Sequence, residues 1–207
     1  MQIDPKTHSH AVNYKVLTNV VVPRPIAWVT SLNSNDVVNL APFSFFNAVS
    51  GKPLYLAVSV GSRDDGTPKD TARNILERRD FVVNLVTEEL LQAMNISAAD
   101  FLPDESEMTA AGLHAAASVH IATPRLAESL VSLECKLFQS LPLGENTLVI
   151  GEVVMMHVAD HLMGPRHHVE NFAPIGRLGS PSLYCRTTDR FDLPRLSYQD
   201  YRKTQPR

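Results

Sequence analysis

The residues with the clearest potential for chemistry lie between 62 and 74, in the sequence Ser-Arg-Asp-Asp-Gly-Thr-Pro-Lys-Asp-Thr-Ala-Arg-Asn. Residues 64–68 favour a turn, because the proline biases the residue before it away from helical geometry. A helix is expected directly afterwards, over 70–79. Asp70 or Thr71 would offer a side-chain oxygen to the free amides of its first turn.

This arrangement could hold a phosphate group. The free amides of a helix start attract anions, and the Thr71 hydroxyl and the cations of Arg63 and Lys69 would lie beside them. The alternative is an ordinary capped surface helix with solvated charges, and the stretch alone leaves both readings open.

The elements around this stretch are mainly strands. Residues 54–60 form a nearly continuous apolar run that leads into the turn, and 81–86 follow the helix as another strand. Residues 25–31 and 37–42 flank a polar turn at 33–36, which indicates a hairpin.

The rest of the chain fits the same fold class. Further strands are expected at 119–121, 132–139 and 146–158, a short helix or turn at 13–22 and a helix at 88–99, whereas 100–112 is irregular. Hairpin connections between strands favour an antiparallel barrel or sandwich: a mainly β fold with helical additions. We expect one domain over 1–207, with a core at about 13–186 and terminal arms at 1–12 and 187–207.

Composition narrows the class of protein. The chain has 207 residues, a net charge of -3 and scattered basic residues, which argues against a nucleic-acid-binding surface. Neither a leader-like amino terminus nor an apolar run of membrane length is present, so we expect a cytoplasmic protein without membrane contact. Cys135 and Cys185 lie far apart in the sequence, as structural thiols of a reducing compartment would.

Several segments, in order, resemble the flavin reductase-like, flavoredoxin-type FMN-binding split-barrel proteins. The matching segments are Pro23-Arg24-Pro25-Ile26-Ala27-Trp28-Val29-Thr30-Ser31, Asn39-Leu40-Ala41-Pro42-Phe43-Ser44-Phe45-Phe46-Asn47, Lys69-Asp70-Thr71-Ala72-Arg73-Asn74-Ile75, Asp104-Glu105 with Ala111-Gly112-Leu113, Glu134-Cys135, and Pro174-Ile175-Gly176-Arg177-Leu178-Gly179 with Tyr184. Each segment is a weak signal by itself, but their ordered combination over about 13–186 is specific.

The resemblance implies a Greek-key split β-barrel that forms a homodimer, with FMN in a groove at the dimer interface. FAD is a possible alternative cofactor. Position by position, the residues expected along the isoalloxazine and ribityl chain are Thr30, Ser31, Ala41, Pro42, Phe43 and Ser44, and those expected around the phosphate are Ser59, Arg63, Lys69, Asp70 and Thr71. Asn74 would support the phosphate loop from the helix, and Arg177 and Tyr184 match positions near the flavin and nicotinamide.

The predicted function is therefore that of an FMN-dependent oxidoreductase, in which NAD(P)H docks transiently and hydride leaves to a flavin or a protein acceptor. A flavoredoxin-like electron carrier and a non-redox flavin-binding module are the alternatives. No Gly-x-Gly-x-x-Gly turn indicates a separate dinucleotide domain, and no Gly-x-Ser-x-Gly elbow indicates a hydrolase. No catalytic residue is assigned, because hydride acceptance by flavin requires no protein acid or base.

Three aromatic residues and a group of histidines lie outside the predicted flavin site. Phe45 and Phe46 are expected in the core, and Trp28 in the core or at an interface. Four histidines crowd into 157–168, but no cysteine or close carboxylate joins them at a ligand spacing, so no metal site is predicted. Residues 160–172 are expected to form an active-site loop. For each histidine in this loop, the alternative is a solvent-exposed side chain that contacts no ligand.

Overall fold

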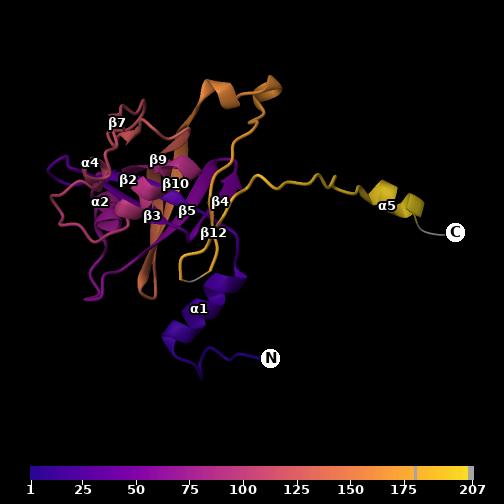
Figure 1. Cartoon of the computed structure of the whole chain (residues 1–207), viewed down its shortest axis with the longest axis horizontal. Coiled ribbons are helices and arrows are strands. Elements are labelled where there is room, and N and C mark those ends of the chain that lie inside the picture. The colour runs from indigo at the N-terminus through magenta and orange to yellow at the C-terminus, as the bar shows by residue number, and fades with distance from the viewer. Residues whose placement is uncertain (180, 205–207) are drawn as a thin grey trace.

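A computed structural model describes residues 1–179 and 181–204 (Figure 1). The expected C-terminal arm at 187–207 is therefore described as far as residue 204, and its last three residues lie outside the described part.

A seven-stranded antiparallel sheet with the order β3-β2-β6-β9-β10-β5-β4 forms the centre of the fold. Its strands are β2 (Ala27–Leu32), β3 (Val38–Phe43), β4 (Phe46–Gly51), β5 (Leu54–Gly61), β6 (Asp80–Asn84), β9 (Val131–Leu143) and β10 (Asn146–Val158). The mainly β prediction is confirmed. The connection from β5 to β6 crosses the sheet, as it does in Greek-key barrels.

The sheet closes incompletely at one corner. Its two edge strands, β3 and β4, are consecutive in the chain and are separated only by Ser44 and Phe45. Two connecting residues span at most about 11 Å, so the opposite edges must meet there and the sheet must curl. No ladder of hydrogen bonds joins β3 to β4 within the described residues, and the barrel is split at this corner.

Two small sheets complete the β structure. One has the order β1-β11-β12, formed by Arg24–Pro25, Gly176–Arg177 and Tyr184–Cys185; the other pairs β7 (Ala115–Ala116) with β8 (Arg125–Leu126). The first small sheet brings β11 and β12 to the start of the chain's first hairpin, beside the corner of the barrel.

The strand predictions are largely confirmed. The expected hairpin forms between β2 and β3, with Ala27 opposite Phe43. Strand β4 was not predicted; it forms by pairing with β5. The strand expected at 119–121 is wrong, because the amides of Val119 and His120 donate to the buried Glu134 carboxylate at 2.7 and 2.8 Å instead of to a neighbouring strand.

Strand β2 is buried on both faces and separates two apolar clusters. Inside the barrel, Val29 packs in a cluster with Phe81. Outside it, Trp28 packs in a second cluster with Met94, and its indole Nε1 donates to Ser97 Oγ at 2.8 Å. The core role predicted for Trp28 is confirmed.

The two neighbouring phenylalanines of the corner differ in their environments. Phe46 packs against the cluster inside the barrel, as predicted. Phe45 does not join that cluster; its ring instead lies 6.3 Å from the Tyr14 ring, on the outer side.

The helices are α1 (His10–Val20), α2 (Asp70–Arg78), α3 (Leu91–Ile96), α4 (Glu107–Ala110) and α5 (Tyr198–Thr204), with 3-10 turns η1 (Glu88–Leu90), η2 (Asp160–Leu162) and η3 (Pro165–His167). Helix α2 confirms the helix expected at 70–79. The helix expected at 88–99 is divided between η1 and α3, and α1 begins within the expected N-terminal arm. None of the helices in the described residues has the length and apolar character needed to cross a bilayer.

Figure 1 shows α1 below the sheet and α5 at the end of an extended segment that leaves the body of the protein. The segment that carries η2 and η3 projects from the opposite side of the sheet to α1.

Candidate functional site

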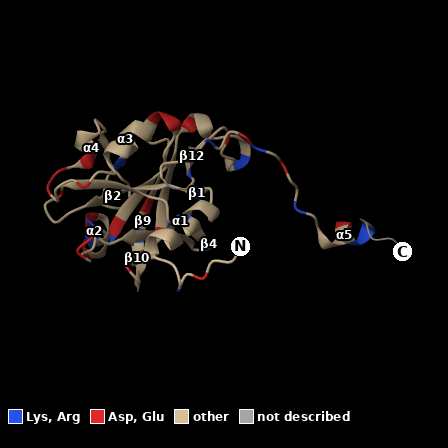
Figure 2. Ribbon diagram, turned by 60° about the horizontal axis from the view of Figure 1, so that its bottom comes forward, with Lys and Arg blue, Asp and Glu red and all other residues tan. Residues whose placement is uncertain are grey.

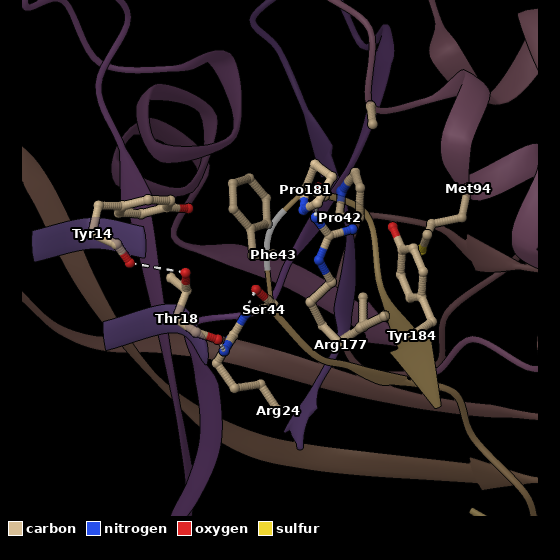
Figure 3. A pocket seen from close by; sticks show the side chains of 13 residues that line it. Tyr14, Thr18, Arg24, Pro42, Phe43, Ser44, Met94, Arg177, Pro181 and Tyr184 are labelled. Atoms are coloured by element: carbon tan, nitrogen blue, oxygen red, sulfur yellow. Dashed lines mark hydrogen bonds between the residues drawn. The ribbon is translucent and has the colours of Figure 1, made fainter. Parts of the chain in front are cut away.

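Two adjoining cavities meet at the open corner of the barrel. The larger has a volume of about 330 Å³ and the smaller about 90 Å³. Pro42, Phe43 and Ala98 line both cavities, so the two are parts of one groove. Figure 3 shows the larger part, with the side chains that surround it.

The corner itself contributes the predicted ring-binding segment. Pro42 and Phe43 end β3, and Ser44 continues from them into the larger cavity, while Ala41 lines the smaller one. The amide of Ser59 on β5 donates to Phe45 O at 2.8 Å, which holds the corner against the barrel. The structure thus brings these four predicted residues to the groove.

The predicted phosphate segment lies at the other end of the same groove. Arg63, Lys69, Asp70 and Thr71 all line the smaller cavity. The turn before α2 forms as expected: the Arg63 amide donates to Thr67 O at 2.8 Å.

This turn is reinforced by its own side chains. Asp65 Oδ1 accepts from both the amide and the hydroxyl of Thr67, at 2.9 and 2.6 Å. These hydrogen bonds lower the pKa of the Asp65 carboxyl. Gly66 has φ 82°, a left-handed conformation that glycine adopts without strain.

The capping prediction for α2 is wrong. Lys69 is the N-cap residue, and no side chain among the described residues caps the helix start. The Asp70 carboxylate instead forms ion pairs with Arg63 and Arg73, and Thr71 Oγ1 accepts from Asn39 Nδ2 at 2.9 Å. The first-turn amides therefore have no side-chain cap.

The charges around the smaller cavity are mixed, and Figure 2 shows acidic and basic residues together at α2. Because Arg63 is paired with Asp70, Lys69 is the lining cation without a carboxylate partner in residues 1–179 and 181–204. Two carboxylates not predicted for the site, Asp100 and Glu107, also line the cavity.

Glu107 is the more deeply buried of these two carboxylates, with 7% of its surface exposed. Burial raises its pKa, although the hydrogen bond from the Leu40 amide to Oε2 at 2.9 Å acts in the opposite direction. Burial is the larger effect, so the pKa of Glu107 lies above its ordinary value.

Three predicted residues lie beneath the groove and do not line it. Thr30, Ser31 and Asn74 are fully buried. Thr30 Oγ1 donates to Pro124 O at 2.7 Å, and Asn74 Nδ2 donates to Ser31 Oγ at 3.3 Å. The sequence predicts that Asn74 supports the loop before the helix. In the structure it joins α2 to β2 instead.

Ser59 is also absent from the lining of both cavities. Its neighbours Val58 and Val60 point into the core, and side chains alternate along a strand, so the Ser59 side chain points outward. There Ser59 Oγ accepts from Asn146 Nδ2 at 2.9 Å.

Arg177 and Tyr184 reach the larger cavity from β11 and β12 (Figure 3). They are directly paired across the two strands, and the Arg177 guanidinium carbon lies 4.6 Å from the Tyr184 ring centroid. The structure therefore places both predicted residues at the groove.

Sequence reasoning missed some of the lining residues. Arg24 lies in the matched Pro23-Arg24-Pro25 segment, which predicts no role for it, and Tyr14 and Met94 approach from helices. No local motif marks Tyr14 or Met94, because only the docking of α1 and α3 brings them to the cavity.

The histidine-rich region lies apart from the groove. No residue of 160–172 lines either cavity, so this chain alone does not form an active-site loop there. His157 Nε2 instead contacts Glu134 Oε1 at 2.6 Å. Burial would raise the pKa of Glu134, but the hydrogen bonds from His157 and two backbone amides outweigh it and lower the pKa.

The described residues hold no cluster of metal ligands, and the buried cysteine is unreactive. Within the described ranges, no three His, Cys, Asp or Glu side chains are grouped to hold a metal ion. Both cysteines are free, and burial strongly raises the pKa of the Cys135 thiol, which keeps it in its unreactive protonated form.

Comparison with known proteins assigns the fold and the family. The chain is 37% identical to nitrilotriacetate monooxygenase component B from Bacillus cereus, with a TM-score of 0.89 over 93% of this chain and 98% of that one. It is 36% identical to the 2-nitrobenzoate 2-nitroreductase of Pseudomonas fluorescens, with a TM-score of 0.86 over 96% and 98% of the two chains. A provisionally assigned flavin reductase with a split barrel domain, from Shewanella frigidimarina, shares the fold with a TM-score of 0.80 at 18% identity, over 95% of this chain and 100% of that one.

The family model for the flavin reductase like domain matches residues 20–190. That range contains the barrel, its open corner, the turn before α2 and the β11–β12 segment. The chain therefore belongs to the flavin reductase-like family and has its split-barrel fold.

Proposed function

We propose that the protein is an FMN-dependent oxidoreductase that takes hydride from reduced nicotinamide and passes it to a flavin or a protein acceptor. The observation that carries this proposal is the continuous groove from the turn before α2 to the Pro42–Phe43 corner. One end of the groove offers groups suited to a phosphate, and the Pro42–Phe43 corner, which lines both cavities, offers an apolar surface suited to a planar ring.

The residues present fit FMN. Lys69 is free of carboxylate partners within the described chain, and the first turn of α2 has uncapped amides, so both can face a phosphate. Thr71 adds a hydroxyl, while Pro42 and Phe43 would hold the ring.

Bound FMN would supply the redox chemistry, since its N5 accepts and releases hydride. The protein would anchor the phosphate, orient the ring against the corner and leave one face of it open to the donor. No side chain is required as an acid or base for this transfer.

The two similar structures suggest different acceptors. The B. cereus protein is a component of a monooxygenase, which favours delivery of reduced flavin to a partner enzyme. The P. fluorescens protein is a nitroreductase, which favours direct reduction of a small substrate on the flavin. An electron carrier with tightly held FMN is a further candidate and would show little turnover with free flavin.

The test begins with the visible spectrum of the purified protein and with the mass of any released chromophore, which distinguishes FMN from FAD. NADH and NADPH oxidation is then measured with excess FMN, and separately with 2-nitrobenzoate. Flavin-dependent turnover supports the proposal. Protein that stays colourless after FMN is added would refute it.

We also propose that the protein acts as a homodimer. Apolar side chains that a lone chain leaves in water support this: on α1, Leu17 and Val20 are 52% and 67% exposed, and in the extended C-terminal segment Phe191 and Leu193 are 88% and 81% exposed. Covering them with a second copy would remove this apolar surface from water.

Light scattering tests the dimer. The wild type is expected at twice the 22.9 kDa chain mass. The variant Phe191→Ser with Leu193→Ser should shift toward the monomer, whereas Ser197→Ala, a change at another exposed position of the same segment, should not. A monomeric wild type would contradict the proposal.

A further inference from the structure

Two arginines on neighbouring strands line the larger cavity. Arg24 on β1 and Arg177 on β11 are direct partners in an antiparallel pair, and both line the cavity (Figure 3). Like charges directly opposite each other destabilise a strand pair. No Asp or Glu of the described residues forms an ion pair with either guanidinium, so both charges remain uncompensated.

Arg24 is a fixed, buried charge. Only 8% of its surface is exposed, and its guanidinium donates to the carbonyl of Thr18 at 2.6 Å and to that of Leu178 at 2.8 Å. These acceptors orient the guanidinium without neutralising it. Burial lowers the pKa of Arg24 and Arg177 lowers it further, against an opposing effect of Tyr14, but a guanidinium remains protonated.

Most N–H groups of the Arg177 guanidinium have no acceptor within the described residues. Its guanidinium carbon lies 4.6 Å from the Tyr184 ring centroid, which fixes the plane of the group, and Nη2 donates to Pro181 O at 2.9 Å. A guanidinium has five N–H donors, so most of them can face a ligand.

The cavity around this pair has no acidic lining residue within the described part of the chain. Beyond the Pro42–Phe43 corner, Met94 and Tyr184 give this cavity apolar and aromatic walls. A planar carboxylate matches the fork of a guanidinium, and a flat ring matches these walls.

We infer that this end of the groove binds the carboxylate of a small aromatic acid, with Arg177 as the direct donor and Arg24 as the fixed charge behind it. The inference rests on the proposed function, because it names the substrate class of a flavin-dependent reaction. Arg177, which the sequence predicts to lie near the flavin and nicotinamide, would bind the substrate instead.

Benzoate is the probe, and neutral benzamide is its matched control. Binding of each is measured by calorimetry to protein loaded with FMN, for the wild type, Arg177→Gln, Arg177→Lys and Arg195→Gln. Arg195 is an exposed arginine outside the cavity, so its substitution removes the same charge elsewhere. Thermal melting checks that each variant folds.

The wild type should bind benzoate at least about tenfold more tightly than benzamide, which is the scale of one charge-assisted hydrogen bond. Arg177→Gln should remove that difference, Arg177→Lys should keep part of it, and Arg195→Gln should leave it unchanged. Equal binding of benzoate and benzamide, or benzoate binding unaffected in Arg177→Gln, would overturn the inference.

Two further outcomes would also overturn it. Inorganic phosphate that displaces benzoate at similar concentration would show a general anion site with no role for the aromatic walls. Benzoate that binds flavin-free protein and is displaced by FMN would show that this end holds the flavin. Because FMN retention is read separately from the spectrum, failure of the inference is distinguishable from failure of the proposed function.

Discussion

The side-chain amide of Asn39 donates a hydrogen bond of 2.9 Å to the hydroxyl oxygen of Thr71. Asn39 lies on β3, which leads to the open corner, and Thr71 lies in the first turn of α2. Both are almost fully buried, at 8% and 1% exposed. This contact therefore joins the phosphate end of the groove to the strand that leads to the Pro42–Phe43 corner.

Thr71→Val should lower the free energy of unfolding by about 1–3 kcal/mol, because the substitution keeps the shape but leaves the buried Asn39 amide only its longer hydrogen bond, to Ser31 Oγ at 3.4 Å. Chemical denaturation measures the change. Thr188→Val, at an exposed position, serves as the control and should have little effect. A loss no greater than that of the control would show that the contact contributes nothing to stability.

The stability should depend on pH through Glu107. Its pKa is raised by burial, so the folded protein holds this proton more tightly than the unfolded chain does. The resulting stabilisation is full below the unfolded pKa of about 4.3 and is lost as the pH rises through the folded pKa.

Glu107→Gln keeps the group neutral at every pH. The difference in unfolding free energy between Glu107→Gln and the wild type should therefore shift in favour of the variant as the pH rises from about 4. Urea titrations at a series of pH values measure it. A difference that stays constant with pH would contradict the raised pKa.

Gly151→Ala should destabilise the barrel by about 1–3 kcal/mol, because a well-packed core does not accept an added methyl group. A Cβ at this position would lie 2.5 Å from Phe81 Cζ and 3.1 Å from Cys135 Cβ. At Gly51 the same methyl group would meet nothing within 4 Å, so Gly51→Ala is the matched control. Equal melting temperatures for the two variants would be the contrary result.

The sequence predicted the elements whose signals are local. The turn at 64–68 and helix α2 depend on a proline, a glycine and the apolar spacing that follows, and both form. Strand β5 was visible as an apolar run. Strand β4 was not, because Phe46–Gly51 contains small and polar residues and becomes a strand only by pairing with β5.

The sequence could not predict which side chains contact each other in the folded chain. Asp70 and Thr71 looked like caps, but Arg63, Arg73 and Asn39 compete for their oxygens in the folded chain. The Glu134 carboxylate likewise accepts hydrogen bonds from the amides of Val119 and His120. The predicted strand at 119–121 would have needed these amides for pairing with a neighbouring strand.

Binding of FMN and of riboflavin to the wild type and to Lys69→Ala, followed by flavin fluorescence, tests the central claim most directly. The two ligands share the ring and differ in the phosphate, so the wild type should bind FMN at least about tenfold more tightly, and Lys69→Ala should lose most of that preference. Lys136→Ala, an exposed lysine outside the groove, should retain it. Equal affinity of the wild type for FMN and riboflavin, or a preference for FMN that Lys69→Ala leaves intact, would contradict the account.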